Sequence, residues 1–384
     1  MTREETLIRK KIMLKSMLKD DAFPLDQKEI INEEIAETVK ELDILQGMPK
    51  RNQKTAFIEE IGLKQLEMNI DRPIFLSPSK IKRRKRDMTR VIRSGIHDID
   101  KYIIGFNPQE LSVWSGSNGS GKSTVLSQVA IEAVNQDFKV AVFSGELKDD
   151  RVLEWINLQC AGKRFTECTQ YANYFRVQNE VHDQINKWLE GKLFIYNNDY
   201  GNNVNKVLKA VMECIRTSGV KMVVIDNMMS LDVASIGGEK YERQTALVIA
   251  LCELAKQYNV HIHFVAHPRK AIGFLRKTDI SGTADLTNAA DNVFIVHRVN
   301  RDFKNATKQD LGFKEDNILY QSSNVIEICK NRDLGIQDIF VGTIFEPESK
   351  RFKNTASEIK RYGWESDKKG FIKVDDNEKI PFDD

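Results

Sequence analysis

An eight-residue glycine-rich pattern constrains the fold of this chain more than any other feature of its sequence. The pattern Gly116-Ser117-Asn118-Gly119-Ser120-Gly121-Lys122-Ser123 directly follows the apolar run Leu111–Ser115 and precedes a helical pattern. In a loop of this kind, glycines let backbone N–H groups turn inward around phosphates, and the N-terminus of the following helix adds a positive dipole. A chance glycine-rich turn would lack this context, so we expect a nucleotide-binding α/β core.

The chemistry expected at this loop is the binding of ATP, or of a dNTP, together with Mg²⁺. Lys122 would supply charge to the β- and γ-phosphate oxygens, and the Ser123 hydroxyl would contact the metal ion. Asp226 ends the apolar run Met222–Asp226 and is the expected second Mg²⁺ contact, although an aspartate at a strand end can also cap a turn. The residues expected around the nucleotide are Gly116, Ser117, Asn118, Gly119, Ser120, Gly121, Lys122, Ser123 and Thr124.

The base that activates the attacking water does not follow Asp226 directly, because the next residue is Asn227 rather than a glutamate. The best candidate is Glu146, which closely follows the apolar run Val140–Ser144. A neighbouring strand of a parallel sheet would direct a residue in this place towards the γ-phosphate. The alternative is that Glu146 is a surface carboxylate at the start of the next helix.

From Thr89 onward the chain alternates short apolar runs with helical patterns, which predicts an α/β fold with a mainly parallel sheet covered by helices. Helical patterns follow Gly121, Val152, Val204 and Thr245. The expected strands are Leu111–Ser115, Lys139–Ser144, Leu193–Asn197, Met222–Asp226, His261–His267, Asn292–His297 and Asn324–Lys330.

The first ninety residues differ from this core and are expected to be helical. Capping-box patterns at Thr2–Glu5 and Asp26–Glu29 predict a helical hairpin over residues 1–47. Residues 48–90 have the features of a linker, with a short helix at Thr55–Met68 and a basic run from Lys80 to Arg90 that is either a solvated face or a contact for nucleic acid phosphates. The ATPase core would then span residues 91–355, and a C-terminal segment, 356–384, would end in an acidic, mobile tail.

Composition excludes several classes of protein. With 41% apolar and 30% charged residues, the 384-residue chain can build packed cores, which excludes a disordered chain. No apolar run is long enough to cross a bilayer, and the first twenty residues lack a signal or transit pattern, so we expect no membrane partner and a cytoplasmic location. The net charge of +2 requires that any site for a polyanion be a local patch.

Five stretches, taken in order, resemble the hexameric RecA-type replicative helicases, and within them the Twinkle and phage primase-helicase branch more than DnaB. The resemblance covers about residues 90–352 and implies a RecA-like P-loop NTPase core in which Glu146 corresponds to the catalytic base. Relatives of this branch commonly carry a primase, for which the first ninety residues are too short, so we expect a helicase without one. The five stretches are Ser94–Asp100 with the glycine-rich loop, Phe143–Glu146, Val224–Asn227, Val265–Lys270, and Lys330–Arg332 with Gly335.

The resemblance implies further roles at the nucleotide. His267 matches a residue that senses the γ-phosphate and couples it to the DNA loop that follows; the alternative is an ordinary buried histidine. Arg332 matches the arginine finger that reaches the ATP of the neighbouring subunit, accompanied by the basic residue Lys330, and the alternative for Arg332 is an ion pair within its own subunit. Arg298 and Phe345 match positions that pack against the base, while core packing is the alternative for Phe345.

The resemblance also implies two DNA-binding loops that face the channel of a ring. Here these loops would be Ser230–Gln244 and Arg269–Asn288, which would hold the single-strand backbone without reading bases. The second loop departs from the family, since Ser281 stands where relatives often have arginine, and an ordinary solvated loop is the alternative. The expected DNA contacts are Arg269, Lys270, Arg276, Lys277, Ser281 and Gly282.

These features predict an ATP-dependent replicative DNA helicase in a bacterial or phage-infected cell. The resemblance alone implies a hexameric ring that translocates 5′→3′ on single-stranded DNA. Expected partners are single-stranded and forked DNA, further copies of the chain, and replication proteins such as a polymerase, a primase or a single-strand binding protein. Two alternatives stay open: a RecA/RadA-like recombinase that forms filaments, and an ATP-binding replication adaptor or helicase loader.

Overall fold

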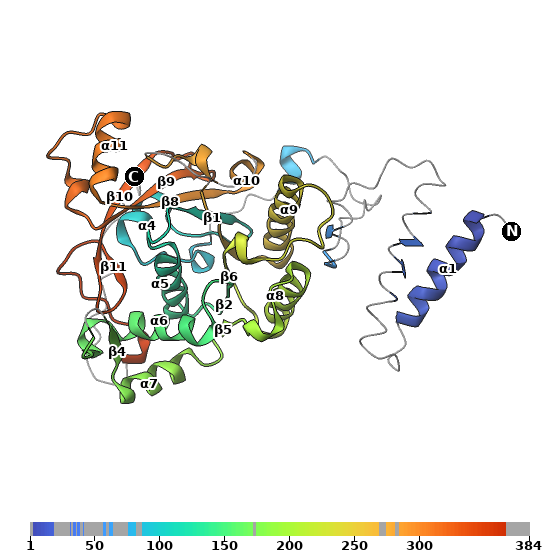
Figure 1. Ribbon diagram of the computed structural model, residues 1–384, viewed down its shortest axis with the longest axis horizontal. Coiled ribbons are helices and arrows are strands. Elements are labelled where there is room, and N and C mark those ends of the chain that lie inside the picture. Colours follow the sequence, from blue (N-terminus) through green and yellow to red (C-terminus); the bar gives the residue numbers. More distant parts are fainter. Residues whose placement is uncertain are drawn as a thin grey trace. The chain divides into compact units, whose positions relative to one another are not determined.

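Figure 1 shows the computed structural model of the chain, which consists of two compact units, Met1–Glu60 and Ile61–Asp384. Each unit is described by itself. The structure describes residues 3–18, 31, 34–35, 37–38, 41, 57–58, 61–63, 76–81, 87–171, 174–268, 274–280 and 284–365. The predicted acidic tail, residues 82–86 of the predicted basic run and most of the predicted helix Thr55–Met68 therefore lie outside the described residues.

The described residues of the N-terminal unit are largely helical, and they include residues 57 and 58. Helix α1 spans Arg3–Leu18, and residues 31, 34, 35, 37, 38 and 41 are also helical. Lys10 on α1 forms an ion pair of 2.8 Å with Glu34. The buried apolar side chains of the unit include Leu7, Leu14 and Ile31. These described residues are helical and bury apolar side chains, and residues 19–30, which the predicted hairpin includes, lie outside the described residues.

The C-terminal unit is built on a nine-stranded sheet with the strand order β11-β10-β9-β8-β1-β7-β6-β2-β5. The six strands from β8 to β5 are parallel, whereas β9, β10 and β11 run antiparallel to their neighbours. The strands are β1 Leu111–Ser115, β2 Val140–Ser144, β5 Leu193–Ile195, β6 Met222–Asp226, β7 His261–Val265, β8 Asn292–Arg298, β9 Asn324–Asn331, β10 Ile339–Glu346 and β11 Arg351–Lys353. A separate two-stranded sheet pairs β3 (Thr166–Cys168) with β4 (Phe175–Val177).

All seven predicted strands are confirmed, with ends that shift by at most two residues. The mainly parallel sheet is confirmed as well, and β3, β4, β10 and β11 are strands that the apolar runs did not predict.

Helices cover both faces of the large sheet. The helices of this unit are α4 His97–Ile103, α5 Lys122–Asn135, α6 Asp149–Ala161, α7 Asn179–Leu189, α8 Val204–Ser218, α9 Lys240–Tyr258, α10 Ala284–Ala289 and α11 Arg301–Leu311. The four predicted helices correspond to α5, α6, α8 and α9, while α4, α7, α10 and α11 were not predicted. Helices α5 and α6 lie on one face, and α8 and α9 lie on the other (Figure 1). Connections that alternate between faces in this way hold the β1–α5 junction at the middle of the sheet.

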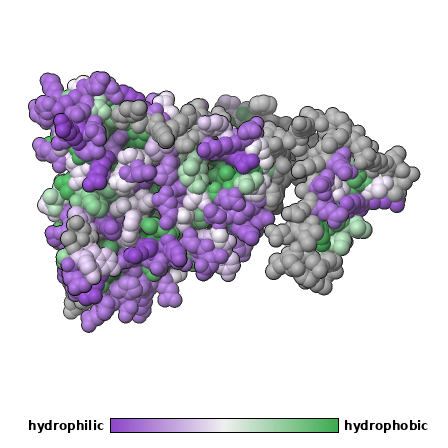
Figure 2. Space-filling model, in the orientation of Figure 1, coloured by the Kyte–Doolittle hydropathy of each residue, from purple (hydrophilic) through white to green (hydrophobic). Residues whose placement is uncertain are grey.

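The main core lies between the sheet and its helices. Trp114 on β1 stacks on Phe294 of β8 with ring centroids 4.2 Å apart, and both side chains are fully buried. The surface visible in Figure 2 is largely hydrophilic over the coloured residues, with apolar side chains confined to scattered patches. In the part of the chain that the structure describes, no helix combines the length and the apolar character needed to span a bilayer.

One buried arginine holds the segment after β11 on the core. Arg351 donates from Nε to the carbonyl of Gln159 at 2.6 Å and from Nη2 to that of Cys160 at 3.0 Å, both near the C-terminus of α6. Its Nη1 donates to the carbonyl of Lys360 at 2.7 Å, and the guanidinium lies over the Tyr362 ring. A permanent positive charge at a helix C-terminus is stabilised by the unpaired carbonyls there, so Arg351 both caps α6 and ties down the following segment.

We predict that Arg351→Met lowers the free energy of unfolding by about 3 kcal/mol, because the buried carbonyls of Gln159 and Cys160 and the part-buried carbonyl of Lys360 lose a charged donor. Chemical denaturation of the full chain would measure the change. The matched control is Arg361→Met, at an exposed arginine of the same segment, which should change stability by less than about 0.5 kcal/mol. Equal effects of the two substitutions would show that Arg351 does not hold this segment.

Candidate nucleotide-binding site

The glycine-rich loop joins β1 to α5 at the carboxyl end of the parallel strands. Lys122, the first residue of α5, is buried, and its Nζ donates to the carbonyls of Gly116 at 2.8 Å and Ser117 at 3.0 Å. On the far side of the loop, Asn324 of β9 donates from Nδ2 to the carbonyl of Ser120 at 2.8 Å. These contacts give the loop one shape, in which its lysine lies inside the curve of the backbone.

Glycine is required in this loop by close packing as well as by backbone conformation. Gly121 has φ of +99°, and a Cβ there would lie 2.7 Å from the ring of Phe352 on β11. At Gly116, a Cβ would lie 2.4 Å from the carbonyl oxygen of Val296 on β8. The loop therefore rests directly on the neighbouring strands, where no larger side chain fits without movement of the backbone.

Two buried charges of opposite sign lie at the centre of the site. Burial lowers the pKa of the Lys122 ammonium, and the carboxylates of Asp226 and Glu146 oppose that shift. Burial raises the pKa of Asp226; a hydrogen bond with Ser123 opposes the rise, and Glu146 adds to it. A further positive charge close to Asp226 would stabilise its ionised form.

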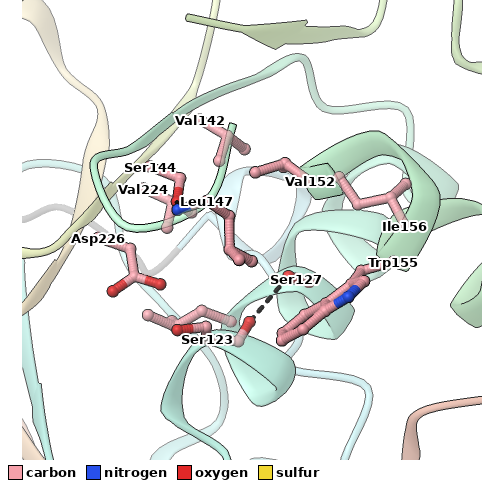
Figure 3. A pocket seen from close by; sticks show the side chains of 11 residues that line it. Ser123, Ser127, Val142, Ser144, Leu147, Val152, Trp155, Ile156, Val224 and Asp226 are labelled. Atoms are coloured by element: carbon pink, nitrogen blue, oxygen red, sulfur yellow. Dashed lines mark hydrogen bonds between the residues drawn. The ribbon is translucent and has the colours of Figure 1, made fainter. Parts of the chain in front are cut away.

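The side chains near Asp226 fit a magnesium ion that is shared with a phosphate. Figure 3 shows Ser123, Asp226 and the Trp155 ring among the side chains that line a small cavity. The volume of this cavity is about 20 Å³. A hydroxyl and a carboxylate are hard oxygen ligands, and Mg²⁺ at phosphate sites takes only one or two carboxylates from the protein. Among the described residues, no three His, Cys, Asp or Glu side chains converge on a metal site built from protein alone. The donor set therefore suits Mg²⁺ bound together with a nucleotide.

Glu146, Asn227 and His267 converge beside this site from the ends of three neighbouring strands. His267 Nε2 lies 3.1 Å from Glu146 Oε1 and 2.8 Å from Asn227 Nδ2, and Asn227 also donates to Glu146 Oε1. Asn227 is buried, whereas the Glu146 side chain is half exposed. The structure brings together Glu146 and His267 as site residues, and it adds Asn227, which the sequence marked only as a missing glutamate.

The two residues expected to pack against the nucleotide's base ring lie close to the glycine-rich loop. Arg298 ends β8, is exposed and pairs in register with Asn324, the residue that holds the Ser120 carbonyl. Phe345 on β10 lies against Phe352 on β11, with ring centroids 5.3 Å apart. Since Phe352 is the ring next to Gly121, Phe345 lies one side chain away from the loop. Phe345 also packs against the main core, so the geometry is compatible with both of its expected roles.

Arg332 and Lys330 bind the end of helix α10. Arg332 pairs with Asp291 at 2.6 Å and donates to the carbonyl of Asn288 at 2.6 Å. Lys330 donates to three carbonyls of the same segment, those of Thr287, Asn288 and Ala290. The Arg332 side chain is half exposed, and both basic groups neutralise the C-terminus of α10.

Of the expected DNA contacts, only Arg276 and Lys277 lie within the described residues; Arg269, Lys270, Ser281 and Gly282 lie outside them. Arg276 pairs with Asp310 of α11 at 3.7 Å and lies over the ring of Phe274. Phe274 in turn stacks on His297 of β8 at 4.7 Å. The described part of the second loop is therefore anchored on β8 and α11, and Lys277 begins a short 3₁₀ turn, Lys277–Asp279.

Comparison with protein families and curated proteins gives a consistent result. The family model described as the DnaB-like helicase C-terminal domain matches residues 91–354. The chain is 27% identical to the Twinkle homolog protein, chloroplastic/mitochondrial, of Arabidopsis thaliana over 57% of this chain and 32% of that protein. It is 24% identical to the replicative DNA helicase DnaB of Mycoplasma pneumoniae over 63% of this chain and 52% of that protein. The chain thus spans about a third to a half of the length of these curated relatives.

Solved structures confirm the fold. One solved structure, described as an ATPase domain, matches with a TM-score of 0.53 and 17% identity, and the match covers 69% of this chain and 91% of that one. A DnaB-like replicative helicase, solved for its interactions with primase, matches with a TM-score of 0.53 and 16% identity, over 68% of this chain and 61% of that one. The predicted RecA-like α/β core is therefore confirmed.

Proposed function

Because the chain belongs to the DnaB-like helicase family, we propose that it is an ATP-driven DNA helicase that works as a hexameric ring and translocates 5′→3′ on single-stranded DNA. The observation that carries the proposal is the position of Glu146 beside a glycine-rich loop, with Lys122 and Asp226 at the same edge of the sheet. Hydrolysis of a nucleoside triphosphate requires a loop that binds phosphates, a carboxylate that binds the metal ion and a base that can reach water, and this arrangement would supply all three.

A few side chains at the carboxyl ends of the parallel strands would share the work of binding and hydrolysing the nucleotide. The loop N–H groups and the Lys122 ammonium would hold the β- and γ-phosphates, and Ser123 and Asp226 would hold Mg²⁺, which supplies charge neutralisation on the phosphate oxygens. Glu146 would accept a proton from the attacking water, and its half-exposed side chain leaves room for that water. His267, in contact with Glu146, would register whether the γ-phosphate is present.

The position of Arg332 supports a site that is completed by a second subunit. Strand β9 begins at Asn324, which touches the glycine-rich loop, and ends at Asn331, which pairs with Asn292 at the start of β8. Eight residues of strand place these ends roughly 23 Å apart. Arg332 therefore lies where the parallel strands begin, at the end of the sheet opposite to its own loop. Once released from Asp291, it would contact the nucleotide of a neighbouring copy.

The proposed DNA contacts lie on the segments that follow β6 and β7, the strands that carry Asp226 and precede His267. A ring would place these segments, Ser230–Gln244 and Arg269–Asn288, around a single strand, where basic groups bind phosphates. We place this activity at a bacterial or phage replication fork in the cytoplasm, with forked DNA as substrate and replication proteins as partners; the relative from Mycoplasma pneumoniae, named a replicative helicase, supports that setting.

We predict that Glu146→Gln lowers kcat for ATP hydrolysis by at least about 100-fold, with KM changed by less than about threefold. The amide keeps the shape of the side chain and cannot accept the proton from water. Steady-state hydrolysis with saturating single-stranded DNA would measure the effect. Glu190→Gln, at an exposed glutamate after α7, is the matched control and should behave as the unmodified chain. Turnover within about fivefold of normal would place the base elsewhere.

A mixture of two inactive variants tests whether Arg332 acts on a neighbouring subunit. Arg332→Ala keeps an intact loop, and Lys122→Ala keeps an intact Arg332, so mixed rings contain some interfaces in which both halves are normal. We expect each variant alone to lose about 10³-fold in turnover, and the mixture to regain hydrolysis in proportion to the fraction of normal interfaces. If mixtures with confirmed subunit exchange stay as inactive as their components, Arg332 is not shared between subunits.

A further inference from the structure

Asn227 uses every hydrogen-bonding group that it has. Its side-chain Oδ1 accepts from the backbone N–H groups of Met229 at 2.8 Å and Ser230 at 3.1 Å. Two backbone donors on one atom identify that atom as the oxygen, so the other end of the amide is the donor. That nitrogen makes the contacts with Glu146 Oε1 and His267 Nε2, and the residue is only 1% exposed.

The contacts of His267 with its two partners exclude each other. Nε2 of a neutral imidazole either accepts or donates, according to which ring nitrogen carries the proton. As an acceptor it pairs with Asn227 Nδ2, and as a donor it pairs with Glu146 Oε1. The three side chains therefore have two arrangements that differ in one hydrogen bond, and in both of them Asn227 remains the donor to Glu146.

The same asparagine also fixes the first turn of the segment that leads into the loop Ser230–Gln244. Ser230 Oγ donates to the Asn227 carbonyl at 2.8 Å and closes the short turn Met228–Ser230. Ser230 also packs tightly on the residue before Glu146, because a Cβ added to Gly145 would lie 2.0 Å from Ser230 Oγ. A displacement of this turn would thus reach Glu146 in two ways, through the contact with its carboxylate and through the packing on the preceding residue, Gly145.

We propose that Asn227 is a positioning residue that orients Glu146 and makes that orientation depend on the turn at the start of the Ser230–Gln244 loop. Single-stranded DNA bound by the loop would fix the position of the turn, and the turn would fix the orientation of the Asn227 amide. The amide would in turn direct Oε2 of Glu146 at the attacking water. Of the two carboxylate oxygens of Glu146, Oε1 has both of the hydrogen-bond partners found among the described residues. Oε2 is therefore the oxygen left to accept the proton from water. The inference rests on the proposed function, since it takes Glu146 as the base.

A positioning role of this kind has a characteristic kinetic signature. Misplacement of a catalytic group by about 1 Å can cost about 100-fold in rate without loss of substrate affinity. A residue that only supports the fold would instead lower thermal stability, nucleotide binding and turnover together. The ratio of DNA-stimulated to basal turnover separates the two roles, because only a link to the DNA loop predicts a change in that ratio.

The test uses Asn227→Ser in the full chain. Serine keeps an oxygen that can cap the turn and adds no charge, but it cannot reach Glu146. We expect DNA-stimulated kcat to fall about 100-fold and the stimulation ratio to approach one, while KM for ATP changes by less than about threefold and Tm stays within about 3 °C. The matched control is Asn203→Ser, because Asn203 also caps a turn of backbone with its Oδ1, at the start of α8, and has no contact with Glu146.

A second variant, Asn227→Asp, keeps both acceptor contacts of the turn and removes the donors to Glu146 and His267, so the same kinetic defect should appear in it. Stimulated turnover like that of the unmodified chain in both variants would overturn the proposal. Parallel loss of Tm, nucleotide binding and turnover would also overturn it, because Asn227 would then be structural. If the unmodified chain itself shows no DNA-stimulated hydrolysis, the proposed function fails instead.

Discussion

The packing of the glycine-rich loop against the strands beneath it is the constraint on which the rest of the site depends. Lys122 is buried inside the loop, where backbone carbonyls hold its ammonium group. The loop can adopt this shape only because Gly116 and Gly121 let it lie on β8 and β11. Since these strands join the β1–α5 junction to the antiparallel part of the sheet, the shape of the loop and with it the proposed phosphate site are fixed by the sheet as a whole.

The direction of the strands then decides which residues can meet. Parallel β2, β6 and β7 end at one edge and deliver Glu146, Asp226 with Asn227, and His267 beside the loop. Antiparallel β9 starts near the loop and carries Arg332 away to the opposite edge. A single chain therefore contains the proposed phosphate site and, far from it, the basic group proposed to complete a neighbour's site. This separation is the structural reason to expect assembly of several copies.

The parts of the fold and site that the sequence predicted depend on local signals. The glycine-rich pattern and the buried parallel strands are continuous in sequence, so the loop between a strand and a helix, the position of Asp226 at a strand end and seven strands were predictable. Strand β10 also carries β-branched and aromatic residues, but its half-buried pattern is not a continuous apolar run, and β3, β4 and β11 have three residues each. The role of Asn227 was not predictable, because its partners Glu146 and His267 lie 81 and 40 positions away and meet it only through strand order.

The central claim is that nucleotide hydrolysis at the carboxyl ends of the parallel strands drives the separation of DNA strands. The most direct measurement is unwinding of labelled forked duplexes that carry a 5′ tail, a 3′ tail or both, with ATP and Mg²⁺. The account predicts ATP-dependent release of the labelled strand from forks that have a 5′ tail, and no release when only a 3′ tail is present. DNA-stimulated hydrolysis without release of a strand from any fork, or strand exchange in its place, would contradict it.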